Sequence, residues 1–267
     1  MKRAVFSFLA TALLLLLSGP ASSAGSATGT PEPGGTIIPT TMLLPSPGEL
    51  INAMDNLGEI DWLSSAAFNS RYDYDNNLTR AMNLGIRATN GFMALQMHDR
   101  IRFDEMVSVI FTLAEELGVS NVVLDQGRAI SDLVQQEDWF AVRRALDGLH
   151  DSIESELQAM GDDDTALLMA AAAWLEGLRA VSHILDRNYD PELSTILYQT
   201  GLVRHFQEKF QTLCPEAKAH PLVERLSKAL PDILALIDVG PGNPVPEENV
   251  HHLFEISTEL IRGIENG

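Results

Sequence analysis

Apolar residues from position 46 to the end recur at the three- and four-residue spacing of amphipathic helices, and this pattern constrains the fold most. No stretch shows the apolar–polar alternation and turn pairs that are typical of β-strands. The helical segments stop at helix-ending residues such as Gly118, Gly161 and Pro215. The sequence therefore predicts an all-α helical bundle of about eight to nine helices. We expect them near residues 46–56, 74–98, 103–117, 122–136, 138–160, 164–186, 191–213, 219–237 and 246–265.

The start of the chain has the pattern of a secretory signal peptide. Two basic residues precede an apolar run from Ala4 to Leu17, and small residues follow up to Ala24. Because that run is shorter than the roughly 20 residues that cross a bilayer as a helix, we expect cleavage after Ala24 rather than an integral membrane anchor. The next residues are rich in Gly, Pro and Thr, which favours disorder. The predicted organisation is a signal peptide at 1–24, a disordered leader at 25–45 and a single helical domain at 46–267.

The charge balance excludes one class of partner. Removal of Lys2 and Arg3 with the signal peptide leaves 16 basic residues against 37 acidic ones, a formal charge of −21. Such a surface repels phosphate backbones and anionic lipid headgroups. The sequence therefore excludes nucleic acid as a partner and predicts a well-solvated acidic surface.

Cys214 is the only cysteine, so the exported protein folds without an internal disulfide and relies on its core. This cysteine usage suits a bacterial periplasm, where we expect the mature protein. Pro215 follows Cys214, and no basic residue or histidine is close in sequence. We therefore interpret Cys214 as a small buried residue rather than as a nucleophile.

Patterns that carry catalysis are poor in this sequence. Residues 73–77 begin like a calcium loop, but Leu78 and Leu84 stand where glycine and glutamate are needed, so helix capping is the better interpretation. Asp162–Asp164 precede a helix, where carboxylates stabilise the N-terminus. His251 and His252 are adjacent and face different sides of a helix, so they do not chelate one metal together. We expect no enzyme, no metal and no cofactor.

A partial repeat joins Gly85–Ala88 (GIRA) and Gly177–Ala180 (GLRA). On a helical wheel both glycines lie in an apolar packing seam, where a small residue lets two helix backbones approach. Arg87 falls on the opposite, polar face, which we expect to be wet. Whether the repeat reflects two pseudo-repeated four-helix units or chance in a chain rich in Ala, Leu and Gly stays open.

Arg179 has different neighbours from Arg87, because its helix is apolar on nearly all sides and is therefore expected to be central. A half-buried arginine needs a carboxylate, which is either Glu176, three positions away, or a carboxylate from a neighbouring helix. A contact between Arg179 and an anionic ligand is the alternative.

A family resemblance can be stated for the segment NLGIRATNGFMAL at residues 83–95. Together with the export leader and the all-helical body, this segment resembles the periplasmic helical-bundle component of bacterial sterol transport systems. The resemblance would cover residues 46–265 and includes no diagnostic motif, so it assigns no binding residue. It implies a soluble shuttle that passes a sterol or similar lipid between membrane-associated transporter proteins.

Large and adaptable side chains in the helical body favour the same function, since helical bundles can hold apolar ligands between helices. We expect a periplasmic lipid-binding carrier, with a non-catalytic interaction scaffold as the alternative. A closed apolar cavity would favour the carrier, and a filled core with an apolar surface would favour the scaffold. Ordinary core packing is the competing interpretation for each candidate ligand-binding residue. The candidates are Met82, Phe92, Met93, Met106, Trp174, Arg179 and Tyr198.

Overall fold

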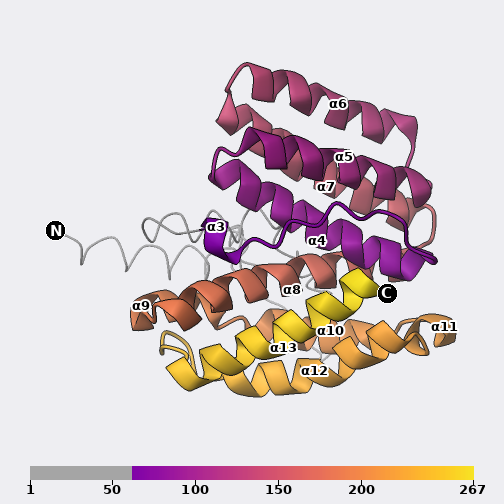
Figure 1. Cartoon of the computed structure of the whole chain (residues 1–267). Helices are drawn as coiled ribbons and strands as arrows, with labels where there is room; N and C mark the ends of the chain where they lie inside the picture. The colour runs from indigo at the N-terminus through magenta and orange to yellow at the C-terminus, as the bar shows by residue number, and fades with distance from the viewer. Residues whose placement is uncertain (1–61) are drawn as a thin grey trace, which may run out of the picture. The chain divides into compact units, whose positions relative to one another are not determined.

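The computed structural model describes residues 62–267, and no β-strand occurs among them (Figure 1). The predicted all-α helical bundle is confirmed. No helix within residues 62–267 is long and apolar enough to cross a membrane. The predicted signal peptide, the leader and the helix expected at 46–56 lie outside the described residues.

The described chain consists of long helices joined by tight corners and a few short helical turns. The long helices are α4 (Asn77–Gln96), α5 (Arg100–Glu116), α6 (Asn121–Gln135), α7 (Trp139–Ala159), α8 (Asp163–Arg187), α10 (Thr200–Phe210), α12 (Pro221–Ile237) and α13 (Glu247–Asn266). The short ones are α3 (Trp62–Ser65), α9 (Pro191–Ser194), the 3₁₀ turn η1 (Thr195–Leu197) and α11 (Pro215–Lys218).

Side chains at the helix starts confirm the capping interpretation. The side chain of Asn76 accepts a hydrogen bond of 2.9 Å from the backbone N–H of Thr79, at the start of α4. Asp162 caps α8 in the same way, through a hydrogen bond of 3.3 Å from the N–H of Thr165. Each cap satisfies a backbone donor that has no partner inside its helix.

The four corners that join α4 to α8 share one geometry. At each corner a residue with positive φ ends the helix, and the next residue donates its N–H to a carbonyl five positions earlier. Gly118 and Gly161 adopt this conformation freely, with φ of 85° and 78°. His98 and Glu137 adopt it with φ of 51° and 57°, at a cost of about 1 kcal/mol each. The ring of His98 lies 5.0 Å from that of Trp139, so this contact joins the two non-glycine corners.

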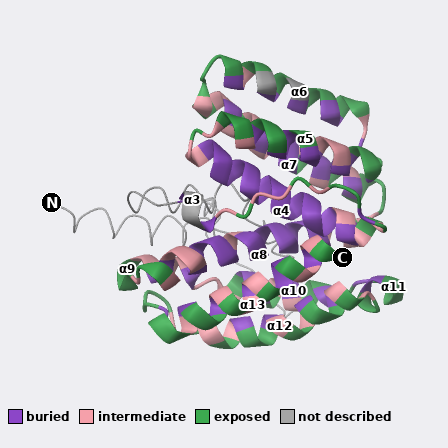
Figure 2. Ribbon diagram, viewed as in Figure 1, coloured by how far each residue is buried: buried purple, intermediate pink, exposed green. Residues whose placement is uncertain are grey.

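Helices α4 and α8 form the centre of the described residues (Figure 2). A Cβ atom on Gly85 would lie only 2.1 Å from the carbonyl oxygen of Met169 in α8, so only glycine fits there. One turn later, the hydroxyl of Thr89 donates a hydrogen bond of 3.0 Å to the carbonyl of Ala173. The packing seam predicted for Gly85 is confirmed, whereas Gly177 is only half-buried.

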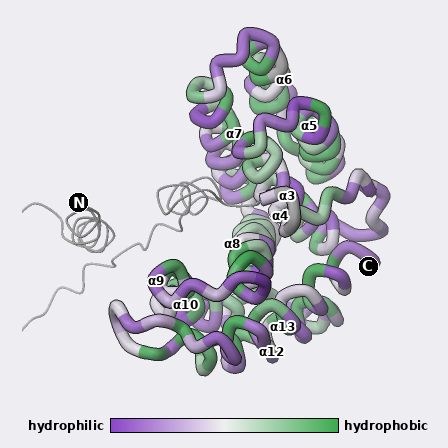
Figure 3. Tube along the Cα trace, turned by 60° about the vertical axis from the view of Figure 1, so that its left-hand side comes forward, coloured by the Kyte–Doolittle hydropathy of each residue, from purple (hydrophilic) through white to green (hydrophobic). Residues whose placement is uncertain are grey.

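The remaining helices cover this central pair. Helices α5 and α7 contact α4, α13 contacts both α4 and α8, and α12 packs on α10 and α13. In Figure 3, α8 passes between the α5–α7 layer and the α10–α13 layer. The expectation that α8 is central is therefore confirmed.

The predicted helix at 191–213 is not continuous. The chain forms α9 and η1, leaves helical geometry at Tyr198 with ψ of 79°, and resumes as α10. The side chain of Gln199 accepts a hydrogen bond of 2.8 Å from the indole N–H of Trp174. The helix is interrupted where Gln199 satisfies this buried donor on α8.

Candidate functional site

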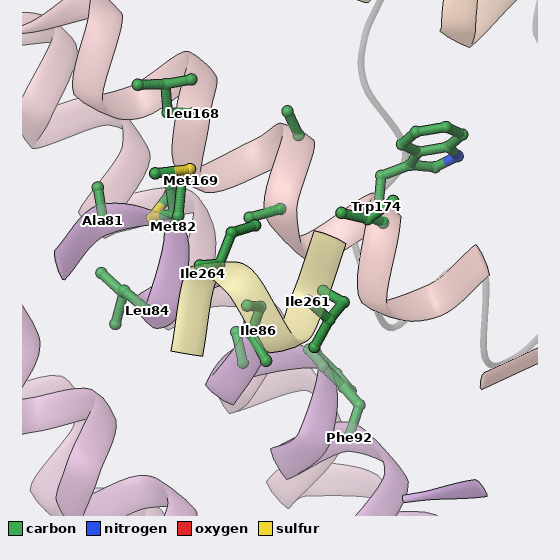
Figure 4. Close-up of a cluster of buried hydrophobic side chains, with 14 of the residues drawn as sticks. Ala81, Met82, Leu84, Ile86, Phe92, Leu168, Met169, Trp174, Ile261 and Ile264 are labelled. Carbon is green, nitrogen blue, oxygen red and sulfur yellow. The ribbon is translucent and has the colours of Figure 1, made fainter. Parts of the chain in front are cut away.

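The side chains predicted to bind a ligand do not gather at one place. Met82, Phe92 and Met93 are buried on α4, and Met106 is buried on α5. In Figure 4, Met82 lies beside Met169, whereas Phe92 and Trp174 do not lie side by side. Met82 and Phe92 are therefore part of the general helix packing and are not neighbours of Trp174.

Trp174 and Tyr198 belong to a second place, where α8 meets η1 and α10. The ring of Trp174 lies 5.5 Å from that of Phe206, and its indole N–H is bound to Gln199. Tyr198 is half-buried, at the break between η1 and α10. The indole N–H of Trp174 therefore has its hydrogen-bond acceptor within the protein.

Arg179 forms a third group with Glu176. Its Nε and Nη2 atoms donate to the two carboxylate oxygens of Glu176 at 2.7 and 2.6 Å, and Nη2 also donates to the carbonyl of Ser65 at 2.6 Å. Burial raises the pKa of Glu176, and Arg179 opposes this shift. We assign the pair as ionised, because two short hydrogen bonds from a guanidinium stabilise the carboxylate form. The expected carboxylate partner of Arg179 is present, and of the two expected sources it is Glu176.

The prediction that Arg87 faces water is wrong. Its side chain is 0% exposed, and Nη1 lies 2.6 Å from Oε1 of Glu265 near the end of α13. Its Nη2 donates to the hydroxyl of Tyr74 at 3.3 Å and to Oδ1 of Asn83 at 3.4 Å. The wheel placed Arg87 correctly, opposite Gly85. The polar face is covered by α13 and by the segment that precedes α4.

The core residues named as ligand candidates are packed against protein on all sides. Met82, Met93 and Met106 each have an exposed fraction of 0%. A cavity of sterol size would leave the side chains that line it in contact with a space wide enough for water. These three methionines therefore line no such cavity in this structure.

Groups with catalytic potential are dispersed or already bonded. Within residues 62–267 no three His, Cys, Asp or Glu side chains are placed to hold a metal ion. The prediction that Cys214 is buried is wrong: it is exposed, because it caps the N-terminus of α11. A hydrogen bond with the Asp164 carboxylate raises the pKa of its thiol. A thiol with a raised pKa is a poor nucleophile.

Two large apolar side chains at one end of the α4–α7 helices face solvent. Ile101 in the first turn of α5 is 82% exposed, and Phe140 in the first turn of α7 is 71% exposed. Both helices begin at the corners with positive φ that the ring contact between His98 and Trp139 joins. In Figure 1 these two corners lie on the same side of the bundle.

Arginines surround these two apolar residues. The guanidinium of Arg144 lies 5.3 Å from the ring centre of Phe140. Arg100 and Arg102 flank Ile101 in sequence and lie 3.8 and 3.4 Å from the carboxylates of Asp104 and Asp99. Arg143 donates to the side chain of Gln96 at the end of α4. We call the surface formed by Ile101, Phe140, Arg100, Arg102, Arg143 and Arg144 the apolar–arginine edge.

The apolar–arginine edge was not predicted from the sequence. Its signal is present as Arg100–Ile101–Arg102 and as Phe140 followed by Arg143 and Arg144. A single apolar residue between arginines does not form a periodic pattern, so the sequence does not mark it. The tertiary structure alone decides which helix starts are neighbours.

Comparison with known proteins adds no second source for a function. The resemblance of residues 83–95 to a sterol transport component has no support from these comparisons, so the proposed function depends on the geometry described above. The chain matches no protein-family model, no curated protein and no solved structure.

Proposed function

We propose that this chain is an exported, non-catalytic protein that functions by docking through its surface, and that Ile101 and Phe140 form the centre of the docking face. The observation that carries the proposal is the contrast between buried ligand candidates and two exposed apolar side chains on one edge. Met82, Met93 and Met106, which were expected to enclose a ligand, are each 0% exposed, whereas Ile101 and Phe140 are 82% and 71% exposed.

Physical chemistry supports a role for such exposure. Burial of an isoleucine or phenylalanine side chain is worth about 1.5 to 3 kcal/mol relative to leaving it in water. A binding event that covers both side chains gains that free energy. Single exposed apolar residues are common, but here two occur at neighbouring corners with four arginines.

The test separates function from stability. Ile101→Ser combined with Phe140→Ser should leave the free energy of unfolding within about 0.5 kcal/mol of the wild type, because both side chains are exposed. A strain of the native host that carries this double variant should nevertheless show the phenotype of a deletion strain. Normal function in that strain, with the protein present at its usual level, would contradict the proposal.

Val122 provides the matched control. It is 72% exposed in the first turn of α6, where none of the four arginines of the apolar–arginine edge lies. Val122→Ser removes a similarly exposed apolar side chain from another corner of the same helices. A strain carrying this variant should behave as the wild type.

The lipid carrier is the second candidate, and one observation favours it. Four methionines, Met82, Met93, Met106 and Met169, are fully buried on α4, α5 and α8, and methionine side chains repack more readily than branched ones. Equilibrium binding of a sterol, with a fatty acid as the comparison ligand, tests this function on the wild type and on Trp174→Ala. If neither lipid binds the wild type at tens of micromolar, the carrier function is wrong.

A further inference from the structure

We infer that the partner of the apolar–arginine edge is the surface of a phospholipid bilayer. This inference rests on the proposed docking function and names its partner. Ile101 and Phe140 would enter the outer part of the apolar layer, and the arginines beside them would bind lipid phosphates.

The two apolar side chains lie at neighbouring corners of the bundle, and both are exposed. Each lies in the first turn of a helix that starts at a tight corner, so no later turn of that helix covers it. The corners are held together by the contact of His98 with Trp139 and by the hydrogen bond from Arg143 to Gln96. Trp139 precedes Phe140 in the sequence, and its half-buried ring adds an aromatic group at the interface.

The arginines at this edge supply groups that bind phosphate. Guanidinium groups bind phosphate oxygens in pairs, and Arg144 already lies over the ring of Phe140. A phenylalanine that enters the apolar layer therefore brings this guanidinium to the level of the headgroups. The ion pair of Arg100 with the exposed Asp104 is worth little, so that carboxylate is a weak competitor for Arg100. Arg102 pairs with the half-buried Asp99, and its guanidinium lies 4.7 Å from the ring centre of Phe68.

The charge of the rest of the chain favours one orientation of the protein relative to the bilayer. The formal charge of −21 that is expected after removal of the signal peptide makes contact with phosphate unfavourable in general. At the apolar–arginine edge four arginines stand among five carboxylates, which are Asp99, Asp104, Glu105, Glu137 and Asp138, so this edge is close to neutral. Approach to a bilayer is therefore expected with its two apolar side chains leading. The overall repulsion predicts binding that is stronger on zwitterionic lipid than on strongly anionic lipid.

A bilayer suits the form of this edge better than a protein partner does. A stable protein interface covers about 800 Å² on each partner and requires a matching shape. Two protruding side chains at separate corners do not by themselves offer a continuous surface of that kind. A fluid bilayer accepts separate side chains without a complementary shape.

Vesicle flotation tests the inference with the protein purified after export. The wild type should float with phosphatidylcholine vesicles. The Ile101→Ser and Phe140→Ser double variant should partition at least about tenfold more weakly, because two apolar side chains no longer enter the layer. Arg144→Gln should weaken binding several-fold, and Val122→Ser should bind as the wild type.

The outcomes separate this inference from the proposed function. Equal flotation of the double variant and of Val122→Ser would show that the edge is not the membrane contact. If the wild type floats with no vesicle, the partner is not a bilayer. In that case a deletion-like phenotype of the double variant would still support docking, to a protein instead. Denaturation curves of each variant check that a loss of flotation does not come from unfolding.

Discussion

Arg87 and Glu265 are 178 positions apart in the sequence, and the buried Arg87 side chain forms an ion pair with the half-buried Glu265, with an Nη1–Oε1 distance of 2.6 Å. Two more bonds hold the same turn of α13. Asn83 donates to the carbonyl of Ile264 at 3.0 Å, and Arg71 donates to the carbonyl of Glu265 at 3.1 Å. The last turn of the chain is therefore part of the structural core around α4.

Arg87→Ala should destabilise the fold by about 3 kcal/mol, because it leaves the carboxylate of Glu265 without its buried partner. Chemical denaturation measures the change. Arg204→Ala is the control, since Arg204 pairs with Asp238 at the surface, where about 0.5 kcal/mol or less is expected. Equal losses for the two variants would show that Arg87 is not structurally important.

Gly85→Ala should also destabilise the fold, by about 1 to 3 kcal/mol. The added Cβ would lie 2.1 Å from the Met169 carbonyl oxygen and 2.9 Å from the Ala173 nitrogen, so α4 and α8 must separate. Gly148→Ala is the matched control, because a Cβ there meets nothing within 4 Å. That change should stabilise α7 by about 0.5 to 1 kcal/mol, and thermal unfolding should show shifts of opposite sign for the two variants.

The Glu176–Arg179 pair predicts a strong coupling. Glu176→Leu alone should cost about 3 to 5 kcal/mol, because it leaves a buried guanidinium without its carboxylate. The double change Glu176→Leu with Arg179→Met should be close to neutral, since it removes both buried charges. A double-mutant cycle in denaturant measures the coupling, and additive effects would mean that the two side chains do not act as a pair.

Two histidines should give opposite pH dependences. Burial lowers the pKa of His150 from its ordinary value of 6.5, so the unfolded chain binds the proton first and stability is lost as pH falls below 6.5. A hydrogen bond with Asp186 raises the pKa of His251, so its stabilisation is present below 6.5 and is lost as pH rises through the raised value.

Unfolding free energies between about pH 8 and about pH 5.5 check these signs. As pH falls, the stability of His150→Gln relative to the wild type should rise. The stability of His251→Gln relative to the wild type should fall over the same range. The same slope in both variants would mean that at least one environment is assigned incorrectly.

The sequence by itself determined the features that depend on residues close together in the chain. The helical periodicity predicted the all-α fold, Asn76 and Asp162 cap the helices they precede, and Glu176 pairs with Arg179 three positions away. Gly85 was also assigned correctly, because a stripe of small residues on one helix face shows where another helix can approach.

Only the tertiary structure decided which polar side chains are buried and which helix starts meet. A helical wheel gives the direction of Arg87 but not what covers it, and its cover comes from Glu265, 178 positions later. The break at Tyr198 depends on Trp174 in another helix, and the apolar–arginine edge exists because the starts of α5 and α7 are neighbours. Periodicity records the direction of a side chain within its own helix, whereas burial is set by elements whose placement depends on the packing of the whole core.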